Sequence, residues 1–332
     1  MNITHNHSHK LIQSECELRK IIPNYPKILD KRIIHSLDHY CLEIIEHASL
    51  LVFGSNDSQN QIDILSRSSF EVMNSKTIHL DLGDYIQSSN ERTHASLYFL
   101  VPGEGHGLRV NGTIHQNKLK TSLSITGAYV HCARAAARSE LWRTHEAAPL
   151  ATCNSSIKNF LKESSFLMLK TMNLTNQTEL SPRGDQAGFI QMINSTSLFI
   201  PERPGNKVAV SLRNIMQNEA VELLLIIPGS NLVMKVNGKA SLTNEAVLLD
   251  TATVNHKRPK LGIRVKDCHF NIHHNAALAM SKPWQASTQI SDNKLTKFSK
   301  VLSKHINGEG LLAKASTPIV QAIVKHDMKN LY

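Results

Sequence analysis

The sequence predicts a mainly β protein with flanking helices, an α+β fold made of two tandem, diverged copies of one barrel-like domain. Three observations predict it. The chain has 332 residues, which is more than one hydrophobic core usually serves. Short apolar segments end at turn signals without strand–helix–strand alternation, which favours antiparallel barrels over a doubly wound sheet. An internal repeat also divides the chain into two similar parts.

The clearest part of the repeat is an apolar strand followed by a Pro-Gly turn. Leu97–Gly103 (LYFLVPG) returns 126 positions later as Leu223–Gly229 (LLLIIPG). Leu108–Gly112 (LRVNG) returns at the same offset as Met234–Gly238 (MKVNG). We therefore expect each copy to contain a strand, a Pro-Gly turn and a second strand that reaches an Asn-Gly turn.

Two flanking segments extend the repeat at other offsets. Ser49–Phe53 aligns with Ser165–Leu169, 116 positions on, so the second copy holds about ten additional residues before the Pro-Gly turn. We expect these additional residues around Pro201–Lys207. Val130–Trp142 aligns with Ile272–Trp284 at an offset of 142, so a further insertion precedes that segment.

These alignments predict the organisation of the chain. The expected parts are a disordered N-terminus (1–10), a first copy with a helical leader up to about residue 48 (11–142), a linker (143–154), a second copy that opens with a short helix at Ser155–Glu163 (155–284), and a helical C-terminal tail (285–332). Apolar spacing in the tail predicts two helices on either side of Gly308-Glu-Gly310. The tail is expected either to cover a ligand groove or to pack on the outer surface.

Composition restricts the partners. The net charge of +10 fits a phosphate-bearing cofactor, nucleic acid or an acidic membrane. Aromatic residues make up only 5% and no basic helix is evident, so nucleic acid is not expected. The five cysteines contain no Cys-x-x-Cys pair, so neither a disulfide framework nor a metal site is expected. The polar N-terminus does not resemble a signal peptide, and no run approaches the ~18 apolar residues of a membrane helix. We expect a cytoplasmic protein without a membrane partner.

One stretch of the second copy concentrates the residue types that bind phosphate. Ser181–Asp185 (SPRGD), Pro201–Lys207 (PERPGNK) and Ser211–Ile215 (SLRNI) follow each other closely. They bring together Arg183, Arg203, Lys207 and Arg213 with the hydroxyls of Ser181 and Ser211. Cations, hydroxyls and free backbone amides are what a phosphate dianion requires. Gly184 and Gly205 are expected to allow close approach or positive φ. The alternative is a solvated hairpin with scattered charges, and the basic run at Lys257–Lys260 is expected to be a solvated loop.

This series of motifs resembles the FMN-binding split barrels related to pyridoxamine 5′-phosphate oxidase, and a branch of uncharacterised bacterial flavin-binding proteins most of all. The segment His131–Trp142 (HCARAAARSELW) resembles the end of the same domain in that branch. The resemblance covers about 11–142 and 155–284. It implies two split barrels that pair within one chain as a pseudo-dimer, with FMN in the groove between them.

The resemblance also implies roles for individual residues. It assigns the phosphate to Arg183, Lys207, Ser211 and Arg213, with Ser181 and Asn206 nearby, and it places Arg138, Ser139 and Trp142 across the interface. The first copy has Asp81–Tyr85 roughly where the second has its phosphate loop, and Leu65–Ser69 in place of SPRGD. In the second copy, Met280–Trp284 replaces the Arg-Ser-x-Leu-Trp motif. We therefore expect one composite FMN site per chain rather than two equivalent sites.

The function implied is an FMN-dependent oxidoreductase of the pyridoxamine-phosphate-oxidase-like class, with an unknown small organic substrate. Pyridoxamine phosphate oxidase activity itself is not expected, because the Arg-x-His signature of true oxidases is replaced by His326–Tyr332 (HDMKNLY). No catalytic acid or base can be assigned. The alternatives are a non-enzymatic flavin- or haem-binding protein for storage, sensing or stress, and a structural remnant without a cofactor. The chain is expected to be a monomer, as a pseudo-dimer, or a homodimer.

Overall fold

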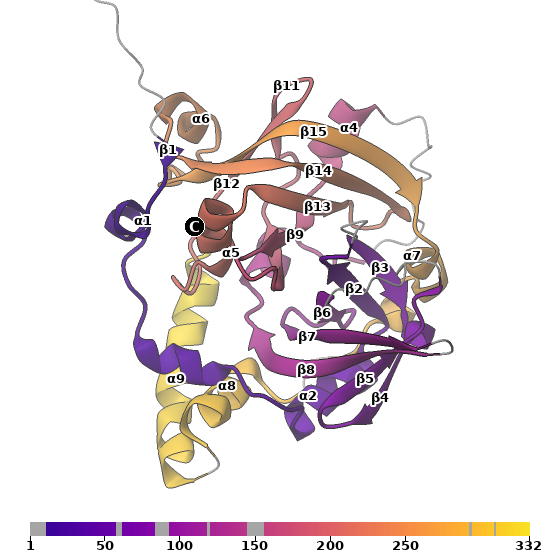
Figure 1. The fold of residues 1–332 in the computed structure, drawn as a ribbon. Helices are drawn as coiled ribbons and strands as arrows, with labels where there is room; N and C mark the ends of the chain where they lie inside the picture. Colours follow the sequence, from indigo (N-terminus) through magenta and orange to yellow (C-terminus); the bar gives the residue numbers. More distant parts are fainter. Residues whose placement is uncertain are drawn as a thin grey trace, which may run out of the picture.

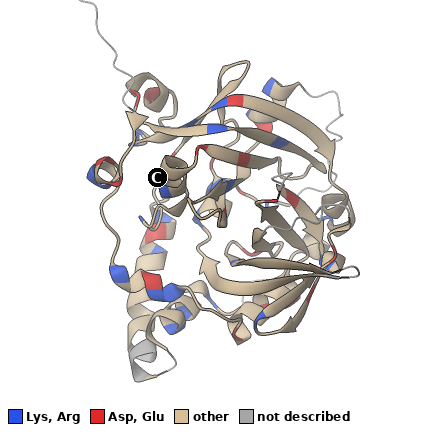
Figure 2. Ribbon diagram, viewed as in Figure 1, with Lys and Arg blue, Asp and Glu red and all other residues tan. Residues whose placement is uncertain are grey.

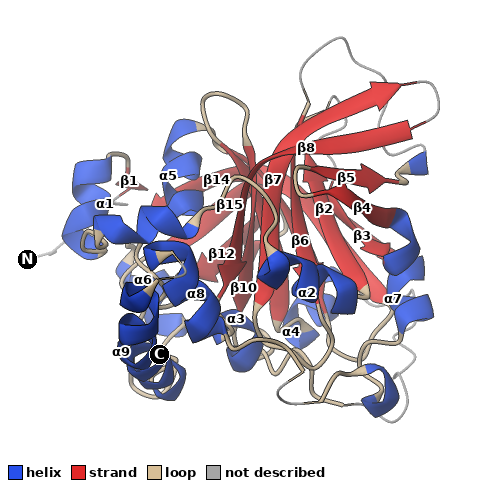
Figure 3. Ribbon diagram, turned by 90° about the horizontal axis from the view of Figure 1, so that it is seen from below, coloured by secondary structure: helices blue, strands red, loops and turns tan. Residues whose placement is uncertain are grey.

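Two curled antiparallel sheets, one from each half of the chain, lie side by side in the computed structural model (Figure 1). The structure describes residues 11–57, 62–83, 93–117, 120–144, 156–291, 294–308 and 310–332. The predicted disordered N-terminus (1–10) and most of the predicted linker (143–154) lie outside these ranges. In Figure 3 the strands form the middle of the molecule, and α1, α8 and α9 gather on one side of it.

Seven strands form the first sheet, called the first barrel below. They are β2 (Leu50–Ser55), β3 (Ile62–Ser66), β4 (Phe70–Asn74), β5 (Thr77–Leu80), β6 (His94–Leu100), β7 (Gly107–Asn117) and β8 (Lys120–His131). Their order across the sheet is β3-β2-β6-β7-β8-β5-β4. A short 3₁₀ turn at Arg67–Ser69 joins β3 to β4, and α3 (Arg134–Arg138) follows β8.

The second barrel repeats this design. Its strands are β9 (Phe166–Met172), β10 (Thr178–Gly184), β11 (Gln191–Asn194), β12 (Ser197–Pro201), β13 (Ala220–Ile226), β14 (Leu232–Thr243) and β15 (Gly262–His274). They pair in the order β10-β9-β13-β14-β15-β12-β11, and β1 (Leu11–Ile12) adds to β14. The accompanying helices are α4 (Ile157–Glu163), α5 (Val210–Gln217), α6 (Ala246–Thr251) and α7 (Ala276–Ser281).

Strand pairing confirms the internal repeat. Leu97 pairs with Val110 between β6 and β7, and their counterparts Leu223 and Val236 pair between β13 and β14. Leu51 pairs with Phe99 in the first barrel as Leu167 does with Leu225 in the second. β5 and β12 are equivalent strands, and their residues differ by 120 positions. Because the offset is 116 before them and 126 after them, about four of the ten additional residues precede β12 and about six follow it. The expectation that all of them lie around Pro201–Lys207 was therefore only partly right.

The predicted Asn-Gly turns are wrong. Asn111-Gly112 and Asn237-Gly238 lie inside the long strands β7 and β14, each at a β-bulge against the following strand. A Cβ on Gly112 would lie 2.3 Å from the Ser124 carbonyl oxygen, and one on Gly238 would lie 2.7 Å from that of Lys266. Glycine is needed here because another strand passes too close for a side chain, and not because the chain reverses. The Pro-Gly turns are confirmed, with Gly103 and Gly229 at φ of 86° and 88°.

The apolar strands are continuous because both of their faces are buried. In β6, Leu97 and Phe99 point into the core of the first barrel, whereas Tyr98 and Leu100 point into a third core between the barrels. Leu224 and Ile226 of β13 enter the same third core from the other side. Alternating side chains of a strand face opposite ways, so a strand with two apolar neighbours has no polar face.

The leader and the tail differ from the barrels in being mostly helical. The leader is not one helix: α1 (Glu15–Ile21), a 3₁₀ helix (Lys27–Arg32) and α2 (His39–His47) are separate. Pro23 and Pro26 lie between the first two, and proline disfavours continuation of a helix through the preceding residues. The tail forms a 3₁₀ turn (Ala286–Thr288), α8 (Phe298–Asn307) and α9 (Leu311–Lys329). No described helix combines the length and the apolar composition that a bilayer span requires.

Candidate functional site

A cavity of about 440 Å³ opens between the two barrels. Its walls come from β8 and α3 of the first barrel, from β10, the loop Pro201–Ala209 and the start of α5 of the second barrel, and from the leader. We call Pro201–Ala209 the cradle loop. The volume lies within the range of about 300–1,000 Å³ that is common for small-molecule sites. Both halves of one chain are therefore needed to build it.

The wall of this cavity is strongly basic. Among the described residues that line it, seven are arginines and three are lysines, whereas one, Glu202, is acidic. Elsewhere basic and acidic residues are mixed along the ribbon (Figure 2). Five of the seven arginines pair with carboxylates, whereas Arg32 and Arg138 have no carboxylate among their hydrogen-bond partners in the described chain. Uncompensated cations in a partly desolvated cavity raise each other's energy unless an anion offsets them. The cavity therefore favours an anionic ligand.

Arg183 lies at the centre of the basic wall. It is in β10, an edge strand, where Pro182 is tolerated because its missing amide costs no ladder hydrogen bond. Its guanidinium pairs with Glu202, and Nη2 donates to Ser211 Oγ at 2.6 Å. Burial, together with the nearby charge of Arg138, lowers the Arg183 pKa to about 10. The positive charge at this point is only partly neutralised.

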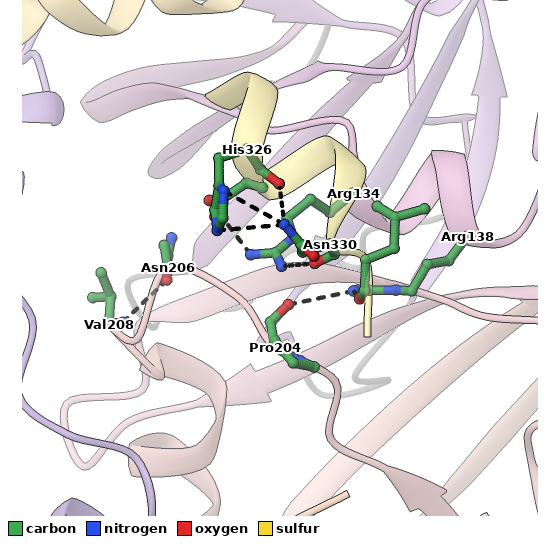
Figure 4. A network of polar contacts seen from close by, with 9 residues as sticks. Arg134, Arg138, Pro204, Asn206, Val208, His326 and Asn330 are labelled. Atoms are coloured by element: carbon green, nitrogen blue, oxygen red, sulfur yellow. Dashed lines mark hydrogen bonds and ion pairs between the residues drawn. The ribbon is translucent and has the colours of Figure 1, made fainter. Parts of the chain in front are cut away.

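The cradle loop holds two residues in the left-handed region. Lys207 has a φ of 62° and Ala209 a φ of 57°. A non-glycine residue there costs on the order of 1–2 kcal/mol, and such strain often occurs at functional sites. The Asn206 side chain accepts from the Val208 amide at 3.0 Å, and Arg19 of α1 donates to the Lys207 carbonyl at 2.8 Å (Figure 4 shows the first contact). The leader thus stabilises the cradle loop through Arg19.

The first helical turn of α5 faces this cavity without a side-chain cap. Its N-cap, Ala209, offers no side-chain acceptor, and Val210 and Ser211 line the cavity. The free amides at a helix N-terminus carry partial positive charge and bind anions. Arg183 and Lys207 line the same cavity.

The first barrel contributes two arginines from α3 (Figure 4). Arg138 donates from Nε to the Gly184 carbonyl at 2.9 Å and from Nη1 to the Pro204 carbonyl at 3.3 Å, so it joins the two barrels across the cavity edge. Burial and the charge of Arg134 lower its pKa to about 10. None of the hydrogen-bond partners of Arg138 in the described chain is a carboxylate, so its charge remains available to an anion.

The end of the tail covers part of the cavity, whereas α8 packs against the core of the first barrel, so each expectation for the tail holds for one part of it. Arg134 and Arg138 donate to the carbonyls of Asn330 at 2.8 Å and Leu331 at 2.9 Å. The Tyr332 hydroxyl donates to Asp185 at 2.6 Å, and burial and this hydrogen bond raise the Tyr332 pKa. The same ring lies 5.2 Å from the Arg203 guanidinium, which pairs with Asp185. The tail therefore forms one wall of the cavity.

Seven of the ten predicted site residues line this cavity, namely Ser181, Arg183, Arg203, Asn206, Lys207, Ser211 and Arg138. The other three, Arg213, Ser139 and Trp142, do not line it. The Ser139 hydroxyl donates to the Ala135 carbonyl at 2.9 Å, and the Trp142 indole donates to the Glu104 carbonyl at 2.6 Å. These last two side chains stabilise the segment after α3.

Of the two predicted glycines, Gly184 allows a close approach as expected, and Gly205 does not. A Cβ on Gly184 would lie 2.1 Å from the Ala135 carbonyl oxygen, so this glycine allows α3 to dock on β10. A Cβ on Gly205 would meet nothing within 4 Å, and Gly205 has no positive φ. The close approach at Gly184 therefore serves the contact between barrels and not a ligand.

Several lining residues were not predicted. Arg32, Arg109, Tyr129 and His131 line the first-barrel end of the cavity, and Arg134 and Tyr332 line the side near the tail. The basic run Lys257–Lys260, expected to be a solvated loop, also lines the cavity. Lys257 donates to the Tyr332 carbonyl at 2.9 Å. The only signal in the sequence was the excess of basic residues, which does not say where they meet.

The related position in the other half is not a second copy of this site. Arg183 pairs with Leu167 of β9, and the equivalent of Leu167 in the first barrel, Leu51, pairs with Leu65. Arg183 therefore corresponds to Leu65, and Ser181 corresponds to Asp63 in the same way. This corrects the alignment of SPRGD with Leu65–Ser69. Asp63 accepts from Lys235 at 2.6 Å and from the Asn275 side-chain amide at 3.0 Å. Of the acidic segment Asp81–Tyr85, the last two residues lie outside the described ranges.

A separate group with the composition of metal ligands lies between α2 and α8. Asp38, Cys41 and His305 have ligand atoms within 4.8 Å of one another. Asp38 already accepts from the Cys41 amide at 2.9 Å and contacts His305 Nε2 at 3.0 Å. Burial acts to raise the Asp38 pKa, but these hydrogen bonds lower it to about 2. Burial raises the Cys41 thiol pKa, so the thiol stays protonated. The group docks α8 on α2, and we propose no metal there.

No protein-family model and no curated protein matches this sequence. Solved structures each resemble little more than a third of the chain. HupZ of Group A Streptococcus is 14% identical with a TM-score of 0.30, over 36% of this chain and 92% of its own. General stress protein 26 of Bacillus anthracis is 13% identical with a TM-score of 0.27, over 36% and 95%. A Clostridium acetobutylicum protein of the pyridoxinephosphate oxidase family, related to general stress protein 26, is 7% identical with a TM-score of 0.26, over 35% and 84%.

Each half is a split barrel. The predicted fold, mainly β with flanking helices and with two such barrels in tandem, is confirmed. At these identities and TM-scores the likeness to solved structures carries no argument about this chain. What the cavity binds must be inferred from its own residues.

Proposed function

We propose that the chain binds one FMN in the cavity between its barrels and is an FMN-dependent oxidoreductase of the pyridoxamine-phosphate-oxidase-like class, acting on a small organic substrate. The observation that carries this proposal is the cavity wall with ten basic residues and one acidic residue, built jointly by the two halves. The second barrel would hold the phosphate, and the first barrel would wall the ring.

The unsatisfied groups of the cavity fit a phosphate. Arg183 Nε and Arg134 Nε are buried and have no hydrogen-bond partner in the described chain. A buried donor without a partner costs about 1–3 kcal/mol, and more if it is charged. Ser211, the amides at the start of α5 and Lys207 add donors on the same side. A dianion with several acceptor oxygens would satisfy these donors together.

The chain's own groups would hold and orient the cofactor. Arg183 and Arg138 would approach the phosphate from different barrels, so that binding also ties the barrels together. Tyr129 and His131 of β8 would form an aromatic wall away from the phosphate. Once bound, FMN would supply the electron-transfer chemistry of its ring. Both walls come from one chain, so the site needs no second subunit.

We expect purified protein to bind one FMN per chain, because Leu65 occupies the position that Arg183 has in the cavity. Titration of FMN, followed by quenching of its fluorescence, should reach its end point at equimolar ratio. Two FMN per chain would contradict the asymmetry. A wild-type protein without affinity for FMN would refute the proposal itself.

The second candidate is a flavin- or haem-binding protein without turnover. Anaerobic addition of NADH or NADPH to the FMN-loaded protein separates the two. Bleaching of the flavin absorbance on the time scale of seconds, with recovery on admission of oxygen or another acceptor, supports the oxidoreductase. A flavin that binds tightly but is not reduced supports the binding protein.

Removal of residues 326–332 should release FMN about ten times faster. The truncation takes away the Tyr332 ring beside Arg203 and the carbonyls that Arg134 and Arg138 contact, so one wall of the cavity is lost. A tenfold change equals about 1.4 kcal/mol, which is the strength of one or two hydrogen bonds. Stopped-flow dilution of the FMN complex measures the rate.

The control for the truncation is Ile323→Ser, which alters an exposed residue of α9 and leaves the last residues in place. It should release FMN at the wild-type rate. Equal rates in the truncated and wild-type proteins would show that the tail is not a wall of the occupied site.

A further inference from the structure

A second basic cluster lies at the first-barrel end of the cavity, away from the cradle loop. Arg32, at the end of the 3₁₀ helix, and Arg109, in β7, both approach the Tyr129 ring of β8, with guanidinium carbons 4.9 and 4.2 Å from its centroid. The His131 ring lies 4.8 Å from the same ring. All four side chains line the cavity.

Only one of the two arginines in this cluster forms a direct ion pair among the described residues. Arg109 pairs with Glu179 at 2.5 Å, which accounts for one of the two charges. Arg32 donates to the Leu29 carbonyl at 2.6 Å and has no carboxylate among its hydrogen-bond partners in the described chain. The two arginines are only 6% and 2% exposed. Water therefore screens the remaining charge poorly.

The cluster also has buried nitrogens that nothing in the described chain satisfies, namely Arg32 Nε, Arg109 Nε and His131 Nε2. Burial lowers the Arg32 pKa and outweighs the attraction of Asp30. Burial also lowers the Arg109 pKa, and the charge of Arg32 acts in the same direction. Burial and both arginines hold the His131 pKa well below its usual value, so the imidazole is neutral at pH 7. An anion at this place would offset the charge and accept from the free donors.

We propose that Arg32, Arg109 and His131 form a subsite for an anionic group of the substrate, a carboxylate or a phosphate, beside the Tyr129 ring. This inference rests on the proposed function, since it names the substrate class of the same cavity. The subsite comes from the leader and the first barrel, whereas the phosphate cradle comes from the second barrel. One cavity would thus hold two anions, one from FMN and one from the substrate.

The test uses benzoate, benzamide and phenyl phosphate as probes, titrated by calorimetry into the protein with and without FMN. We expect benzoate or phenyl phosphate to bind at least about ten times more tightly than neutral benzamide, because only the anions compensate Arg32. The stronger of the two anions identifies the group that the subsite prefers. Equal affinity for the anions and benzamide would overturn the proposal, and so would displacement of FMN by benzoate.

Matched variants separate the subsite from the cradle. Arg32→Gln should weaken benzoate about tenfold and change FMN affinity less than about twofold, and Arg32→Lys should retain most benzoate affinity. Arg183→Ala should weaken FMN and leave benzoate unchanged. If wild type binds benzoate in this pattern but not FMN, the function proposal fails and the subsite stands. If FMN binds but Arg32→Gln leaves benzoate affinity unaltered in a protein that melts like wild type, the subsite fails.

Discussion

Replacement of Arg183 by alanine is expected to weaken FMN binding by about 100-fold. The guanidinium links β10 to the start of α5, with Nη2 at 2.6 Å from the Ser211 hydroxyl oxygen. Its removal takes away a charged donor from the phosphate and leaves Glu202 without its partner and repulsive to an anion in the same cavity. A charge-assisted hydrogen bond contributes about 1.5–3 kcal/mol, and every 1.4 kcal/mol is tenfold in affinity. Fluorescence titration with FMN measures the change.

Two further variants make this result specific. Arg183→Lys keeps the charge but not the planar fork, so we expect a loss of about tenfold. Arg264→Ala removes another partly buried arginine of the second barrel, which faces Glu245 at 3.8 Å and does not line the cavity. Its FMN affinity should equal that of wild type. An Arg183→Ala protein that retains FMN would show that the phosphate does not lie in the cradle.

Breaking the buried ion pair of Lys170 and Glu222 should lower the free energy of unfolding by about 3–5 kcal/mol. The two side chains are 3.0 Å apart, and the residues are 1% and 5% exposed. Lys170 also donates to the Ser55 carbonyl of the first barrel at 2.6 Å, so the pair lies where the barrels meet. Glu222→Leu leaves a buried ammonium group without its counter-charge. Urea unfolding, followed by circular dichroism, measures the loss.

The double variant Lys170→Met/Glu222→Leu is the control, because it removes both charges and retains the volume. It should recover most of the stability. A double variant as unstable as Glu222→Leu would show that shape and not charge is responsible for the loss.

The pH dependence of the single variant follows from the lysine. Burial lowers the Lys170 pKa even with Glu222 present, and the loss of Glu222 removes the larger part of the attraction that opposes this, leaving that of Asp57. The folded-state pKa then lies below the unfolded value of about 10.4. The destabilisation is therefore complete below the folded pKa and decreases as the pH rises from there towards about 10.4. A difference in the free energy of unfolding between wild type and Glu222→Leu that stays constant between about pH 7 and pH 10 would contradict this account.

The fold was largely predictable because the two barrels preserve local patterns. The offset of 126 positions predicted equivalent strands in the two copies, and the structure pairs Leu97 with Val110 as it pairs Leu223 with Val236. Register is shared because it depends on which side chains each strand buries. The Asn-Gly dipeptides were misassigned as turns because a turn and a bulge both require glycine. Only the neighbouring strand, 2.3 Å from a Cβ on Gly112, distinguishes them.

The grouping of basic and hydroxyl side chains on the second-barrel side of the cavity was predictable for the same local reason. Arg183, Lys207 and Ser211 lie within about 30 residues, and their residue types alone indicate an anion. The first-barrel side of the cavity was not predictable from the sequence. Arg32 and Arg109 look like ordinary surface cations in sequence, and they meet at Tyr129 only because the leader and two strands converge there.

The amino-acid sequence alone established that the chain is duplicated and that its second half concentrates arginine, lysine and serine residues in one stretch, because both depend on residues close together in the chain. The tertiary structure decided which residues line the cavity from the other side, and that the tail brings Tyr332 to Asp185. Those contacts exist because the barrels bury their outer apolar faces against each other, which brings distant segments to one cavity. No local pattern records that docking.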